Sequence, residues 1–176
     1  MHDHFARNHF RMFAAYNRWA NARLYAVSAA LPDADYRAER GAFFGSLQGT
    51  LNHILVADRI WLRRFTGEGP SPTRLDEILH DDLAGLSAAR QAEDARIVDW
   101  VASLDAADLA GTFSYRAITQ PKDITQPLAP ALAHFFNHQT HHRGQAHILI
   151  TIAAGKDAAP PLDLIYFQRE TGIGLT

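Results

Sequence analysis

Apolar residues recur every three or four positions along much of the chain, which is the spacing of amphipathic helices. Over residues 5 to about 31 they fall on one helical stripe, and Pro32 and Asp33 then interrupt the pattern. A second helix is predicted from Ser46, a suitable N-cap, to about residue 65, where GEGPSP ends it. The next periodic stretch predicts a third helix over about residues 75 to 104.

The remainder of the chain contains one more long periodic segment. Before it, GTFSYRAIT alternates weakly and predicts a short strand or hairpin. The fourth long helix is predicted from near Pro127, a good first-turn residue, to Gly155, a good C-terminal stop. A short helix over about residues 162 to 170 follows, with Gly172 beyond it. Four long helices with one apolar face each predict an all-α protein, a four-helix bundle.

Composition narrows the class of protein. The chain has 176 residues, of which 47% are apolar, so we expect one domain over residues 1–176. Its net charge of −2 provides no basic surface for nucleic acid. Without cysteine there is no disulfide, thiolate ligand or cysteine nucleophile. MHDHFARNHF lacks the apolar stretch of a signal peptide, and no apolar run is long enough for a membrane helix. We therefore expect a soluble cytoplasmic protein with no nucleic-acid or membrane partner.

Three histidines lie within FNHQTHHRGQ, residues 136–145. On a helix, His138 and His142 project into the apolar arc of the fourth helix, about 40° apart and one turn along. His141 and Asn137 point toward the other side, and His134 lies at the margin. A pair at positions i and i+4 can share one metal ion. The alternative is that both are hydrogen-bonded residues of the core.

A third metal ligand would have to come from another helix. His53, in LNHILVADRIWL, lies beside the apolar stripe of the second helix and could face a neighbouring helix. Its alternative role is that of a half-buried packing residue. His9, near the stripe of the first helix, is the reserve ligand. Gln139 follows His138 where a zinc-protease motif HExxH would have a glutamate, so that motif is absent.

Two charged residues stand where the periodicity predicts core. Arg23 falls in the middle of the first helix's apolar stripe, and Asp58 in the middle of the second's. Our hypothesis is that they form a buried ion pair between these two helices. The alternative is that the stripe is misplaced by one residue.

Four segments together resemble the DinB-like family of damage-inducible, metal-dependent proteins. They are, in order, YNRWANARLY, FGSLQGTLNHILVADRIWLRRF, HFFNHQTHHRGQAHILI and LDLIYFQRETG. The most specific element is HxxxHRGQ, from His138 to Gln145. The resemblance implies a bundle of the DinB/YfiT-like type, a homodimer and a metal site of three histidines. Carried over residue by residue, the ligands fall on His53, His138 and His142, and His141 is not a ligand.

The resemblance also implies chemistry, because related members include thiol-dependent S-transferases and a maleylpyruvate isomerase. Three neutral imidazoles leave a divalent ion an open position, and they suit zinc or nickel. We expect a metal-dependent enzyme for a small-molecule substrate, such as an S-transferase with a low-molecular-weight thiol cosubstrate. The alternatives are a metal-dependent hydrolase and a non-enzymatic metal-binding stress protein.

Four further residues are candidates for roles around the ligands. Gln145 and Asn137 could orient the imidazoles, and Arg143 could bind a substrate anion. Tyr166 could reach the site from the C-terminal helix. The alternative for each is an ordinary structural role, such as capping or bridging helices.

Overall fold

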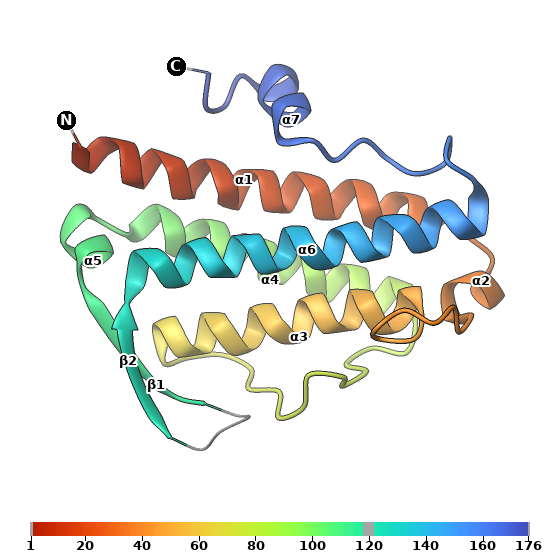
Figure 1. Ribbon diagram of the computed structural model, residues 1–176, viewed down its shortest axis with the longest axis horizontal. Coiled ribbons are helices and arrows are strands. Elements are labelled where there is room, and N and C mark those ends of the chain that lie inside the picture. Colours follow the sequence, from red (N-terminus) through yellow and green to blue (C-terminus); the bar gives the residue numbers. More distant parts are fainter. Residues whose placement is uncertain (1, 118–121, 176) are drawn as a thin grey trace.

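Four long helices make up most of the computed structural model, which describes residues 2–117 and 122–175. They are α1 (His2–Ser28), α3 (Leu47–Thr66), α4 (Leu83–Ser103) and α6 (Leu128–Ala154). Helix α1 packs against α4 and α6, and α3 packs against the same two, so the four helices share one core (Figure 1). The predicted all-α four-helix bundle is confirmed.

The direction of the helices determines the length of the connections. Helices α1 and α6 run one way and α3 and α4 run the other way (Figure 1). The connection from α3 to α4, residues 67–82, therefore crosses the length of the bundle, and we call it the crossover. Two short helices, α2 (Asp33–Arg37) and α5 (Ala106–Ala110), were not predicted. The C-terminal α7 (Leu164–Thr171) lies against α1.

None of the described helices combines the length and the apolar composition that crossing a membrane requires.

Local sequence signals account for most of the helix ends. Ser46 caps α3, because its side chain accepts a hydrogen bond from the backbone N–H of Gly49. Gly155 ends α6 and Gly172 ends α7, each with a positive φ that favours glycine. These three predicted boundaries are confirmed.

A two-stranded hairpin precedes α6, as predicted. Strands β1 (Thr112–Arg116) and β2 (Asp123–Pro127) pair antiparallel, with Tyr115 opposite Ile124. Residues 118 and 119, the end of the predicted segment, lie outside the described residues.

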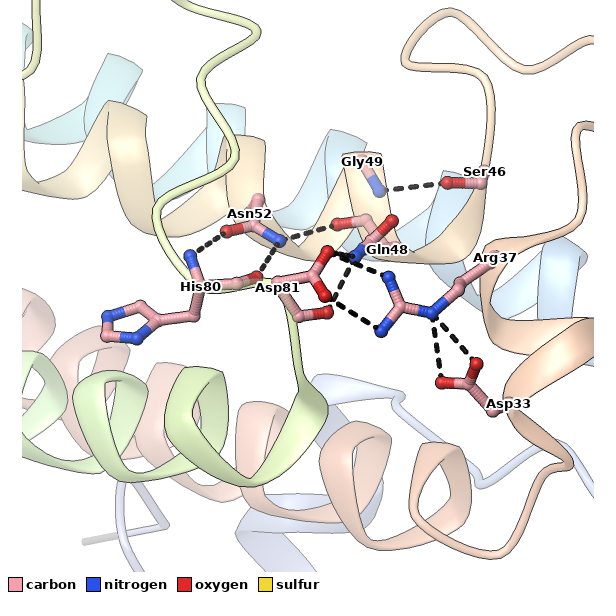
Figure 2. Close-up of polar contacts among 8 residues, drawn as sticks. All are labelled: Asp33, Arg37, Ser46, Gln48, Gly49, Asn52, His80 and Asp81. Atoms are coloured by element: carbon pink, nitrogen blue, oxygen red, sulfur yellow. Dashed lines mark hydrogen bonds and ion pairs between the residues drawn. The ribbon is translucent and has the colours of Figure 1, made fainter.

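The predicted start of the third long helix, near residue 75, is wrong. Helix α4 begins only at Leu83, because Asp82 caps it by accepting a hydrogen bond from the N–H of Gly85. The residues before Asp82 bind α3 instead. The side chain of Asn52 accepts from the N–H of His80 and donates to its carbonyl (Figure 2). The leucines in this segment have helical spacing, but the backbone groups of Leu75 and His80 bond to side chains of α3 instead of to a helix of their own.

Asp81 ties the end of the crossover to α2 and α3. Its carboxylate accepts hydrogen bonds from the Arg37 guanidinium at 2.8 and 3.2 Å and from the Gln48 amide at 3.2 Å (Figure 2). Arg37 also binds Asp33, the first residue of α2. Exposed ion pairs contribute little stability individually. Together, these contacts join the end of the crossover to α2 and α3.

The ion pair predicted between Arg23 and Asp58 is wrong, although Asp58 is buried as expected. Asp58 pairs with Arg90 of α4 at 2.5 Å. Arg23 is half-buried and pairs with Glu170 of α7, also at 2.5 Å. Helical periodicity indicates which face of a helix is covered, but it does not indicate which helix covers it.

Asp58 is part of a buried polar network that joins all four long helices. The Gln139 amide donates to Asp58 at 2.6 Å, and Arg90 also lies 3.1 Å from Asp94. The side-chain amides of Asn17 and Asn21 on α1 donate to Asp94. The side-chain oxygens of the same two asparagines accept from Arg143 of α6. The network holds two carboxylates and two guanidiniums, so its charges balance within the core.

Candidate metal centre

Helices α3 and α6 bring three predicted histidines together. One ring nitrogen from each of His53, His138 and His142 lies within 4.8 Å of the other two. His142 Nε2 is 3.2 Å from His53 Nε2 and 3.1 Å from His138 Nε2. Nitrogens bound tetrahedrally at about 2.0–2.1 Å from zinc lie roughly 3.4 Å apart. The spacing therefore suits imidazoles that share a metal ion.

Hydrogen bonds at the far side of two rings determine which nitrogen carries the proton. His53 Nδ1 is 2.7 Å from the carbonyl oxygen of Leu75, which can only accept, so Nδ1 is the donor. His142 Nδ1 donates in the same way to Gln145 Oε1 at 2.8 Å. In the neutral rings each Nε2 is therefore a bare acceptor. Facing acceptors repel each other unless a cation or a proton lies between them, so this arrangement favours a bound metal.

The three imidazoles are largely removed from water. His53 is 3% exposed and His142 is 8% exposed. Burial lowers the pKa of His53 to about 4. Burial and then the neighbouring imidazoles lower the pKa of His138 to about 3. The neutral form, which is the form that binds metals, is therefore the stable one at neutral pH.

Aromatic rings lie on two sides of the cluster. Phe44, in the loop between α2 and α3, stacks on His53 with ring centroids 3.7 Å apart. It also meets His142 edge-on at 5.6 Å. On the other side, the ring of His134 is 5.8 Å from that of His138. The apolar ring of Phe44 therefore limits solvent access to the cluster on its side.

Two of these contacts could not be expected from the pattern of the sequence. Leu75 contributes only its backbone carbonyl, which leaves no side-chain signal. Phe44 belongs to a pair of phenylalanines that Gly45 separates from the helix cap Ser46, and two large apolar residues in a loop were the available signal.

Some of the residues predicted to surround the ligands contact the histidine cluster, and others do not. Gln145 orients His142, as predicted, and its amide also donates to His141 at 3.3 Å. His141 and Asn137 are exposed, which agrees with the directions expected of them. Among the described contacts, Asn137 makes none with the imidazoles, so its predicted orienting role has no support.

Two residues expected near the site belong elsewhere. Arg143 is 2% exposed and donates to Asn17 of α1, so it bridges helices and does not face a substrate. Tyr166 packs against Trp19 of α1, with ring centroids 6.3 Å apart and the rings tilted, and is not part of the cluster. The reserve ligand His9 packs among the phenylalanines of α1 and is not part of the group.

Replacing Asn52 by alanine is expected to weaken metal binding although it removes no ligand. Asn52 holds His80, and so holds the crossover whose Leu75 carbonyl fixes the ring of His53. Losing an outer contact of this kind typically costs about 10–100-fold in metal affinity. A competition titration with a chromophoric chelator measures the change, and Asn137→Ala is the control that should bind normally. Wild-type affinity in Asn52→Ala would show that the His53 ring is oriented without this contact.

Similarity to known proteins extends over nearly the whole chain. The sequence model of the DinB family matches residues 1–169, which include the three histidines. The chain is also similar to Protein DinB of Bacillus subtilis (strain 168), with 25% identity over 173 residues that cover 89% of this chain and 92% of that protein. With its four-helix bundle and a histidine cluster that could hold a metal ion, the chain belongs to the DinB family.

Proposed function

We propose that the protein is a metal-dependent enzyme for a small-molecule substrate, with His53, His138 and His142 as the ligands of one divalent ion. The observation that supports this most strongly is that the three Nε2 atoms converge, while the Nδ1 protons of His53 and His142 are engaged elsewhere. Imidazole ligands suit zinc or nickel. A divalent ion held by three neutral imidazoles has room for another ligand and lowers the pKa of a water or thiol bound to it.

The surrounding residues favour S-transfer over hydrolysis. No carboxylate belongs to the histidine group among the described residues. Gln139, beside His138, is buried and donates to Asp58 in the core, so it does not serve as a base at the site. Water needs a proton acceptor as it attacks, whereas a thiol bound as thiolate is already a nucleophile. Because the chain has no cysteine, that thiol is a low-molecular-weight cosubstrate.

Elemental analysis of purified protein tests the metal site. We expect about one divalent ion per chain, lost in the folded variants His53→Ala, His138→Ala and His142→Ala. The exposed neighbour provides a matched control, because His141→Ala should retain the metal. A folded wild-type protein that takes up neither zinc nor nickel would overturn the proposal. If His53→Ala alone among the three variants retained the metal, the third ligand would be another residue.

The reaction class is tested on the metal-loaded protein. Turnover of a chlorodinitrobenzene that requires an added small thiol would support S-transfer. Cleavage of a nitrophenyl ester without thiol would favour the hydrolase. An intact metal site with neither activity would favour a non-enzymatic metal-binding protein. The homodimer and the cytoplasmic location stay predictions.

A further inference from the structure

The β1–β2 hairpin lies beside the C-terminal end of α3 (Figure 1). Residues of β1, of α3 and of the segment after α3 line a positively charged pocket there. We call it the arginine pocket. Its volume is about 290 Å³, and no carboxylate is among the described residues that line it. Its polar lining consists of Arg63, Arg64, Arg116, Ser71, Ser114 and Tyr115. This concentration of positive charge is unusual in a chain whose net charge is −2.

The three arginines of the pocket differ in what they bind. Arg63 donates to the carbonyl of Gly69 at 2.7 Å, and Arg116 lies 3.3 Å from the Asp123 carboxylate. Arg64 has neither a hydrogen bond nor an ion pair among the described residues. Burial lowers the pKa of Arg64, as expected for a guanidinium that leaves water without a counter-ion. Among the described residues that line the pocket, Arg64 is therefore the arginine without a hydrogen-bond acceptor.

Two aromatic rings position the Arg64 side chain. Its guanidinium carbon lies 4.6 Å from the ring centroid of Trp61 and 4.4 Å from that of Tyr115. A guanidinium stacked on aromatic faces keeps its N–H groups free at its edge. Because the rings restrict the side chain, less entropy is lost when an acceptor binds.

We propose that the arginine pocket binds the carboxylate or phosphate group of a small anionic molecule, with Arg64 as the principal donor. Both groups present oxygens that the planar fork of arginine can bind in pairs. Ser114 and Tyr115 of β1 line the same pocket.

Side-chain contacts connect this pocket to the metal centre. Arg64 lies over Trp61, the ring of Trp61 is 5.1 Å from that of His134, and His134 is next to the ligand His138.

Titration with inorganic phosphate and with succinate tests the pocket, followed by tryptophan fluorescence at constant ionic strength. Because Trp61 contacts Arg64, a saturable change in fluorescence is expected, and Trp61→Phe should remove it. Arg64→Met should weaken binding about tenfold or more, because a charge-assisted pair is lost. Arg74→Met is the matched control, since Arg74 is exposed, pairs with Asp76 and does not line the pocket. The two probes distinguish a phosphate site from a carboxylate site.

Further variants separate this proposal from that of the metal site. Arg64→Met should keep its metal, and His138→Ala should keep its anion affinity while losing metal. Arg64→Lys retains the charge without the planar fork, so intermediate affinity is expected even if Arg64→Met folds poorly. Equal affinity in Arg64→Met, Arg64→Lys and wild type would overturn the proposal. A fluorescence change that depends only on ionic strength would also overturn the proposal.

Discussion

Replacing Asp58 by alanine is expected to lower the free energy of unfolding by about 3–5 kcal/mol. The substitution removes the carboxylate that pairs with Arg90 at 2.5 Å and accepts from Gln139 at 2.6 Å. Arg90 is 1% exposed, so water cannot take the place of the missing partner. The cost is that of leaving the buried Gln139 amide without its acceptor and the buried Arg90 cation with Asp94 as its remaining counter-ion.

Urea denaturation of the metal-free protein near neutral pH measures this loss. Asp123→Ala is the control, because Asp123 also pairs with an arginine but is exposed. Its effect should stay within about 0.5 kcal/mol. Similar losses in the two variants would show that Asp58 contributes no more than a surface pair. Metal-free protein is used so that changes in metal affinity do not enter the comparison.

Acidification from about pH 6.5 to pH 4 is expected to destabilise the metal-free protein. An unperturbed histidine has a pKa of about 6.5, which describes the unfolded chain. In the folded protein the pKa is about 4 for His53 and about 3 for His138, chiefly through burial. The unfolded chain therefore binds protons first. Stability that is fully present above about pH 6.5 is lost as the pH falls, by up to about 1.4 kcal/mol per pH unit for each histidine.

Asp58 acts in the opposite direction over part of this range. Burial raises its pKa to about 6 against the attraction of Arg90, whereas a carboxylate in the unfolded chain titrates near 3.9. The folded protein therefore binds this proton first, and Asp58 favours folding as the pH falls from about 6 to 4. The stabilising effect of this one carboxylate on acidification offsets the destabilising effect of about one histidine. Since burial also lowers the pKa of His142, the net effect remains a loss of stability.

Denaturation midpoints measured in urea between about pH 7 and pH 4 test this expectation. His53→Gln and His138→Gln each remove one group of lowered pKa, so each should make the urea midpoint depend less steeply on pH. Asp58→Asn removes the opposing group and should steepen this dependence. A midpoint independent of pH in the metal-free wild type would contradict the burial of neutral imidazoles described above.

Much of the fold could be predicted because its signals are local. Periodicity located the four long helices, and Ser46, Gly155 and Gly172 marked ends through caps that involve only neighbouring residues. The same geometry placed His138 and His142 on one face of a helix. The position of His53 beside the apolar stripe of its helix already favoured it over His9 as the third residue of the cluster, and the family resemblance pointed to the same residue.

Only the tertiary structure decided which helix faces which. Periodicity correctly indicated that Asp58 is buried, but Arg90 became its partner because α4 packs beside α3. The crossover lost its predicted helix because Asn52 binds its backbone, and it then supplied the Leu75 carbonyl to His53. The arginine pocket likewise needs α3 and the hairpin side by side. Spacing along a chain specifies the direction of a side chain from its own helix, but contacts between helices depend on how all of them pack together.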